Sequence, residues 1–194
     1  PATTECQLRY GYSQWATGLP AQVESLLVYE GGATSKMFAV SNSAAYNVTS
    51  GGAVGAAVWS GKTNSRWQHV NVTTSGGSFL YAANGVDAPL LYDGATWTVI
   101  TGASTPAITG VTTTTLNSPI VFKNRVWFLG ANTLKTWYLP TSAVGGAANA
   151  VDVSAVAQLG GYVVAHGTWT IDAGTGVDDL YVIVTSQGEV IVYQ

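Results

Sequence analysis

Four segments of the chain repeat one local pattern, and this repetition constrains the fold more than any other feature. Each has an apolar strand near an aromatic residue, a turn rich in Asn or Gly, and a second apolar strand that closes on an aromatic residue. This combination is the signature of a β-hairpin. The four segments comprise residues 38–48, 81–93, 127–138 and 181–193.

The spacing of these hairpins matches a known repeat architecture. Their anchor residues are 43, 47 and 54 residues apart, namely Phe38, Tyr81, Phe128 and Val182. A four-stranded propeller blade takes about 40 to 50 residues. Flanking strands are predicted at residues 23–29, 67–73, 119–122 and 162–166, and at 53–59, 96–101 and 151–156. We therefore expect an all-β, β-propeller-like fold of about four blades of antiparallel strands, with a β-sandwich or a barrel as the alternative.

The repeats also predict the organisation of the chain. The blades comprise about residues 21–60, 61–102, 117–157 and 158–194, and residues 1–20 form an N-terminal segment that packs on the propeller. The last blade has no fourth strand, because its third strand ends at Tyr193. We expect either that the chain is a fragment of a longer protein or that the N-terminal segment supplies the missing strand.

The composition excludes several classes of protein. Hydrophobic residues make up 47% of the 194 residues, whereas charged residues make up 9%, with seven Lys and Arg against ten Asp and Glu. Disordered chains have the opposite balance, and binding to nucleic acid through phosphates needs clustered Lys and Arg. No apolar run reaches the length of about 18 residues that a membrane helix needs. The single cysteine, Cys6, excludes an internal disulfide.

One acidic loop is a candidate metal site. Residues 171–179 contain Asp172, Asp178 and Asp179 in a glycine-rich stretch, and carboxylate oxygens are typical calcium ligands. The spacing lacks the order of an EF-hand loop. A solvated connecting loop, in which Asp178 or Asp179 caps a turn, is the favoured alternative, so calcium is the only cofactor that the sequence suggests.

The remaining polar residues do not form a catalytic pattern. His69 and His166 lie within apolar strands, where we expect packed residues and not metal ligands, since no third ligand is near in sequence. Residues 92–97 resemble the Asp-box of sialidase-like propellers, in which an Asp and a Trp hold a hairpin turn. That motif supports a fold and not a catalytic role. We therefore expect a protein that is not an enzyme.

Several strings resemble the tail nozzle or hub proteins of short-tailed phages and prophages, also described as tail tube or stabilisation proteins. The likeness covers most of the chain and is strongest in residues 8–12, 15–20, 66–68, 84–94, 122–128, 137–140 and 167–170, and in the stretch from 178 to 194.

This resemblance implies a structural virion protein. Its members carry β-propellers, are longer than this chain, form a ring that is a hexamer, and contact the portal or adaptor and the tail fibres. The ring continues the channel through which DNA is ejected, so the implied location is the phage tail. The resemblance implies neither catalytic residues nor sequence-specific binding of nucleic acid, and a weakly acidic wall would let DNA slide by repelling phosphates.

Two other functions remain open from the sequence. A carbohydrate-binding propeller would use Trp97 with Asp93, or the acidic loop, because indole faces suit the apolar faces of sugars. A sialidase-like hydrolase would need an arginine cluster for the substrate carboxylate, whereas the three arginines are scattered at Arg9, Arg66 and Arg125.

Overall fold

The computed structural model describes residues 11–32, 34–172 and 177–193, without the side chains of residues 171–178. Within these residues the protein is built from β-strands, with one short 3-10 helix, η1 (Thr113–Thr115). The strands form four antiparallel sheets and two small parallel pairs. The prediction of an all-β, propeller-like fold with four antiparallel units is confirmed, and the described strands close no barrel.

The four main sheets follow one another in chain order. Sheet 1 contains β2 (Val23–Glu30), β3 (Ser35–Ser41) and β4 (Ala44–Asn47), and sheet 2 contains β6 (Gln68–Thr74), β7 (Gly77–Ala83), β8 (Leu90–Tyr92) and β9 (Trp97–Val99). Sheet 3 contains β11 (Leu116–Phe122), β12 (Arg125–Gly130), β13 (Lys135–Tyr138) and β15 (Asn149–Asp152). Sheet 4 contains β16 (Val163–Asp172), β17 (Val177–Thr185) and β18 (Val190–Tyr193).

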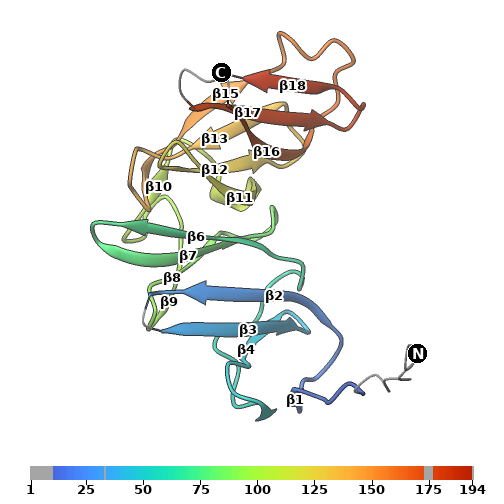
Figure 1. Ribbon diagram of the computed structural model, residues 1–194, viewed down its shortest axis with the longest axis vertical. Coiled ribbons are helices and arrows are strands. Elements are labelled where there is room, and N and C mark those ends of the chain that lie inside the picture. Colours follow the sequence, from blue (N-terminus) through green and yellow to red (C-terminus); the bar gives the residue numbers. More distant parts are fainter. Residues whose placement is uncertain (1–10, 33, 173–176, 194) are drawn as a thin grey trace, which may run out of the picture.

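The sheets are stacked in a row, with sheet 1 and sheet 4 at opposite ends (Figure 1). The first strand of each sheet lies beside the first strand of the next, from β2 to β6, β11 and β16. This arrangement resembles that of propeller blades, whose first strands line a common axis. The row is open, because sheets 1 and 4 do not meet.

Tight turns explain why the hairpins form where they do. Lys123 and Asn124 have φ angles of 47° and 56°, and they connect the paired residues Phe122 and Arg125. Two consecutive residues with positive φ form the hairpin turn whose twist matches that of the strands. Asn42 and Ser43 form the same kind of turn, with φ angles of 51° and 59°.

Alternation of side chains then builds the core. In β7, Leu80 and Ala82 pack toward sheet 1, whereas Tyr81 and Ala83 pack toward sheet 3. Successive strand residues point to opposite faces, so each inner sheet contributes to two apolar layers. The same holds for β12, in which Phe128 faces sheet 2 and Trp127 faces sheet 4.

One predicted strand is wrong. Residues 53–59 were expected to form the outer strand of sheet 1, but only Trp59 pairs there, through an isolated bridge to Ala45. The backbone leaves the edge of sheet 1 at Gly52, which has a φ of 106°. Gly52 and Ala53 instead form β5 (Gly52–Ala53), which pairs in parallel with β1 (Ala16–Thr17). The second parallel pair joins β10 (Ile108–Thr109) and β14 (Gly146–Ala147).

Candidate interaction surface

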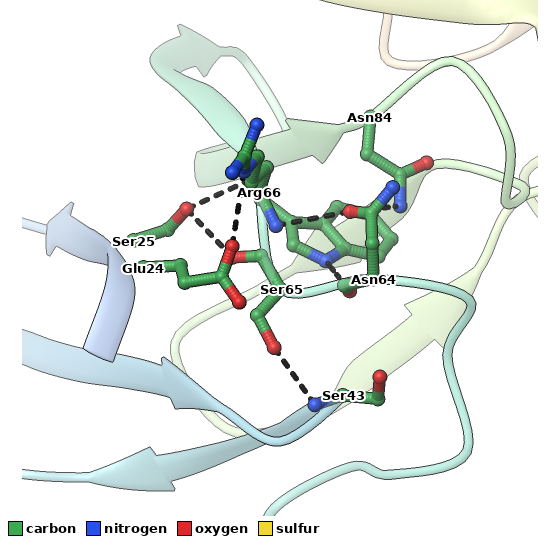
Figure 2. A network of polar contacts seen from close by, with 8 residues as sticks. Glu24, Ser25, Ser43, Asn64, Ser65, Arg66 and Asn84 are labelled. Carbon is green, nitrogen blue, oxygen red and sulfur yellow. Dashed lines mark hydrogen bonds and ion pairs between the residues drawn. The ribbon is translucent and has the colours of Figure 1, made fainter. Parts of the chain in front are cut away.

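The junction between sheets 1 and 2 is held by a network of polar contacts around residues 64–67 (Figure 2). The Ser25 hydroxyl donates to the Ser65 carbonyl and accepts the Trp67 N–H, both at 2.8 Å. The Ser43 N–H donates to the Ser65 hydroxyl at 2.7 Å. We call residues 62–67, which lead into β6, the linker. Ser25 reaches the linker because a β-bulge lies between Val23 and Ser25, and a bulge redirects the side chains of its strand.

Three further contacts of Arg66 and Asn64 belong to the network in Figure 2. Arg66 forms an exposed ion pair with Glu24, with an Nε to Oε2 distance of 3.0 Å. The Asn64 side chain accepts the Arg66 N–H at 2.9 Å and a longer bond of 3.4 Å from the Asn84 amide. These contacts bind the linker to the first strand of sheet 1 and to the loop after β7.

Asp87 joins the same linker from the other side. Its carboxylate accepts the backbone N–H and the hydroxyl of Thr63 at 2.9 Å, and the Asn84 amide at 2.8 Å. Burial raises the pKa of Asp87, but the hydrogen bonds from Asn84 and Thr63, together with the charge of Lys62, outweigh it and lower the pKa. The carboxylate therefore acts as a structural acceptor.

Side chains of sheet 2 satisfy the free edge of β2. The Asn71 amide donates to the Val28 carbonyl at 2.8 Å, and its oxygen accepts the Glu30 N–H at 3.0 Å. The His69 Nε2 accepts the Val28 N–H at 3.3 Å. Burial lowers the pKa of His69, which keeps Nε2 available as an acceptor. The packed strand histidine predicted at this position is thus also a bridge between sheets.

His166 makes the corresponding bridge between sheets 3 and 4. Its Nε2 contacts the carbonyl of Ser118, and its Nδ1 contacts the hydroxyl of Tyr181. Because a carbonyl only accepts, Nε2 carries the proton and Nδ1 accepts from Tyr181. Burial lowers the pKa of His166 to about 4, although the bond to Ser118 raises it. The ring is therefore neutral, and both nitrogens have partners.

Trp97 and Asp93 lie at the outer end of the junction between sheets 1 and 2. The Asp93 carboxylate accepts the N–H groups of Ala95 and Thr96, at 2.8 and 2.7 Å, and the Thr96 hydroxyl at 2.9 Å. Trp97 is partly buried against Phe38 and Tyr92, with ring centroids 5.1 and 4.9 Å away. Asp93 thus holds the hairpin turn, in the structural manner of an Asp-box.

A pocket of about 440 Å³ opens beside Trp97, and Lys36 and Asn47 also line it. The Lys36 Nζ donates to the Tyr92 hydroxyl at 2.8 Å and to the Gly94 carbonyl at 2.9 Å. The pocket therefore places the indole that the carbohydrate hypothesis names beside a cation, whereas Asp93, the second residue of that hypothesis, does not line it.

The acidic residues of the predicted calcium loop are only partly described. The side chains of Asp172 and Asp178 lie outside the described residues. Asp179 accepts a hydrogen bond of 2.7 Å from the Thr170 hydroxyl across the hairpin. Among the described side chains there is no group of three or more His, Cys, Asp or Glu that would hold a metal ion. Calcium binding stays a prediction.

The arginines do not form a substrate site. Arg66 pairs with Glu24 at the junction of sheets 1 and 2, whereas Arg125 in sheet 3 donates to the Leu139 carbonyl at 3.3 Å. Arg9 lies outside the described residues, as does Cys6. The described arginines thus offer no cluster for a substrate carboxylate.

The outer face of sheet 4 is apolar. Residues that oppose one another in an antiparallel sheet share a face, so the pairing of β16, β17 and β18 defines this surface. Among the described side chains it consists of Ala165, Gly167, Trp169, Leu180, Val182, Val184, Val190 and Val192. We call these residues the valine face. The exposed Val164 lies beside it, at the bulge between Val163 and Ala165.

The centre of the outer face of sheet 1 is apolar as well. Strand pairing places Leu26, Val28, Met37, Ala39 and Tyr46 there, with the exposed Glu30 and Ser35 at the end of the same face. Residues 15–19 cover part of this face, and the Trp15 indole donates to the Val48 carbonyl at 2.8 Å. A groove of about 320 Å³ remains, lined by Trp15, Ala16, Leu19, Val23, Leu26, Met37, Ala39 and Val48. We call it the sheet 1 groove.

Sequence reasoning missed the polar bridges and the two outer faces. The bridges join residues about 40 positions apart, such as Ser25 and Ser65, and nothing local marks them. The valine face had a visible signal, since Leu180, Val182 and Val184 alternate with the core residues Tyr181 and Ile183. A strand that is apolar at every position, and not only at every second one, is typical of a strand with both faces covered.

The described residues contain no helix long and apolar enough to cross a membrane. The chain matches no protein-family model, no curated protein and no solved structure.

Proposed function

We propose that the chain is a structural virion protein, the propeller-like part of a tail nozzle or hub in a short-tailed phage. The resemblance of its sequence strings to that family supports this proposal. The observation that carries it is the apolar surface at both ends of the row of sheets, namely the valine face and the sheet 1 groove. Such apolar surfaces suit a subunit that is packed between neighbours in an assembly.

The proposed role is mechanical. A ring of subunits, six by the resemblance, extends the channel below the portal or adaptor and adjoins the fibres, and it holds the genome until ejection. The chain has a net charge of −3, and a weakly acidic wall repels phosphates instead of binding them. The function assigns no catalytic residue and no sequence-specific contact with DNA.

Localisation in particles tests this proposal. An antibody against the chain should label one end of short-tailed virions in electron micrographs, and the protein should sediment with purified particles. Labelling of an unrelated capsid protein, which covers the whole head, is the control. A protein that is found only outside particles would contradict the proposed function.

A carbohydrate-binding propeller is the second candidate, and the pocket beside Trp97 and Lys36 favours it. If it is correct, glycan arrays should show binding at micromolar concentrations, and Trp97→Ala should remove that binding while the far-UV spectrum is unchanged. Trp169→Ala is the matched control, since Trp169 is exposed on the valine face and far along the chain. An array without any bound glycan rejects this candidate.

A further inference from the structure

The loop between β7 and β8 holds a chemically labile pair, Asn84 and Gly85, which is the only Asn followed by Gly in the sequence. In such a pair the backbone nitrogen of the glycine attacks the side-chain carbonyl carbon of the asparagine, since glycine has no Cβ to hinder the approach. A bond forms between Gly85 N and Asn84 Cγ, the bond between Cγ and Nδ2 breaks, and the proton of the attacking nitrogen leaves with the amide group as ammonia. Water then opens the succinimide ring at one of its two carbonyl carbons, which gives aspartate or isoaspartate.

The fold occupies the nucleophile of this reaction. The Gly85 N–H donates to the carbonyl of Leu116, the first residue of β11 in sheet 3, at 3.0 Å. The Asn117 side chain also lies against Gly85, so close that a Cβ at this position would be 2.9 Å from the Asn117 Nδ2. The Gly85 nitrogen is therefore free to react only after the loop separates from β11.

The fold also fixes the electrophile. The Asn84 Oδ1 accepts the N–H of Val86 at 3.1 Å and the N–H of Asp87 at 2.8 Å. The Asn84 Nδ2 donates to the Asp87 carboxylate at 2.8 Å, and to Asn64 of the linker through a longer bond of 3.4 Å. These four contacts hold the carboxamide over the backbone of residues 86 and 87, so it does not turn its carbon toward the preceding nitrogen of Gly85.

We propose that Asn84 is a modification site that deamidates only while this loop is separated from β11 and from Asp87, and that the product keeps the loop from closing again. The site reports on two junctions, because Leu116 belongs to sheet 3 and Asn64 to the linker between sheets 1 and 2. The inference is independent of the virion role, since it needs only local opening of the folded chain.

Both products lose contacts that the unreacted residue makes. Aspartate has an oxygen in place of Nδ2, so the donor to the Asp87 carboxylate is lost at a distance of 2.8 Å, and two carboxylates this close repel each other. Isoaspartate routes the main chain through the side-chain carbon, which lengthens the backbone before Gly85 and displaces its bond to Leu116. Because Asp87 also accepts the Thr63 N–H at 2.9 Å, the change weakens the hold of the loop on the linker.

Rates of deamidation test the first half of the proposal. The whole chain is incubated at mildly alkaline pH, folded or in urea, and mass spectrometry of proteolytic peptides follows the conversion of Asn84. We expect conversion in the folded chain to be at least about tenfold slower than in urea, because it waits for local opening. Equal rates in the folded and unfolded chain overturn the proposal.

A variant identifies the contacts that protect the site. Asp87→Ala should raise the rate at Asn84 in the folded chain, because it removes the acceptor of Nδ2. Asp93→Ala is the matched control, since the Asp93 carboxylate holds the next turn of the same sheet in a similar way. Far-UV spectra establish that each variant is folded. A rate that both variants raise equally, or that neither raises, contradicts protection by Asp87.

The effect of the product is tested by substitution. Asn84→Asp should lower the urea midpoint of the chain, whereas Asn149→Asp, at an exposed amide with one contact of 3.4 Å, should leave it unchanged. The double variant Asn84→Asp/Asp87→Asn exchanges donor and acceptor, so it should recover part of the loss. An Asn84→Asp midpoint equal to that of the original chain overturns the second half of the proposal.

Discussion

The junction between sheets 1 and 2 differs from the junction between sheets 3 and 4 in how its polar contacts are distributed. The first spreads its polar contacts over many residues, including Ser25, Ser65 and Asn71. The second concentrates them on His166 and Tyr181. The aromatic contacts of the second junction also centre on Tyr181. Its ring stacks on Phe122, with centroids 5.5 Å apart, and contacts Trp127 at a centroid distance of 4.5 Å. Distributed contacts tolerate single losses, whereas concentrated ones do not.

The largest effect is therefore expected at Tyr181. Tyr181→Ala should lower the free energy of unfolding by about 3 to 5 kcal/mol, because it removes a fully buried ring and leaves a cavity. Urea unfolding followed by fluorescence measures this change. Tyr162→Ala is the control, since Tyr162 is exposed beside the same sheet. A loss below about 1 kcal/mol at Tyr181 would show that the second junction is not concentrated there.

The next largest difference between the two junctions is expected in the pH dependence of stability. The pKa of His166 in the folded protein is about 4, below its ordinary value of 6.5, so the unfolded chain takes up the proton more readily. The free energy of unfolding therefore keeps its full value above pH 6.5. It falls by about 3 kcal/mol as the pH decreases toward 4.

His166→Gln tests the source of this pH dependence. Stability curves between pH 7 and 4 should be flatter for this variant than for the original chain, because the titrating group is gone. His69→Gln should flatten them less, since His69 makes one long hydrogen bond of 3.3 Å. Equal flattening by the two variants would remove the distinction between the junctions.

Loss of Asn71 should have an intermediate effect at the first junction. Asn71→Ala leaves the Val28 carbonyl and the Glu30 N–H without their partners, and we expect a loss of about 1 to 3 kcal/mol in thermal or urea unfolding. Asn149→Ala serves as control, because its amide makes a single exposed contact of 3.4 Å. Similar losses at both positions would argue against a specific role of Asn71.

The smallest effect is expected for the ion pair drawn in Figure 2. Arg66 is 82% and Glu24 is 39% exposed at the side chain, so solvent and salt screen their attraction. Arg66→Ala should change the unfolding free energy by at most about 1 kcal/mol, and less in high salt. A loss as large as that of Asn71→Ala would mean that the linker depends on this pair.

The sequence predicted what depends on local patterns. Alternation placed the four hairpins, and their turns follow from residues such as Asn42 and Asn124, which adopt positive φ readily. The prediction of an outer strand of sheet 1 at residues 53–59 was wrong. Gly52 and Ala53 pair instead with β1, which is distant in the sequence. Local propensity does not include such competition for backbone partners.

The site divides in the same way. The turn-holding role of Asp93 was readable, since its contacts lie within three residues. The bridges of His166 and Asn71 were not, because their partners are 48 and 43 positions away and are backbone groups without a sequence signature. Strand register brings these groups together, and register is a property of the folded sheets.

The side-chain cover of β2 bears on solubility. A bare strand edge is a template for intermolecular β-pairing and aggregation, and many proteins protect it with lysine. This chain, with 9% charged residues, instead fills that edge with the amide of Asn71 and the imidazole of His69. Removal of Asn71 or His69 would therefore expose backbone groups of β2 to pairing with other chains.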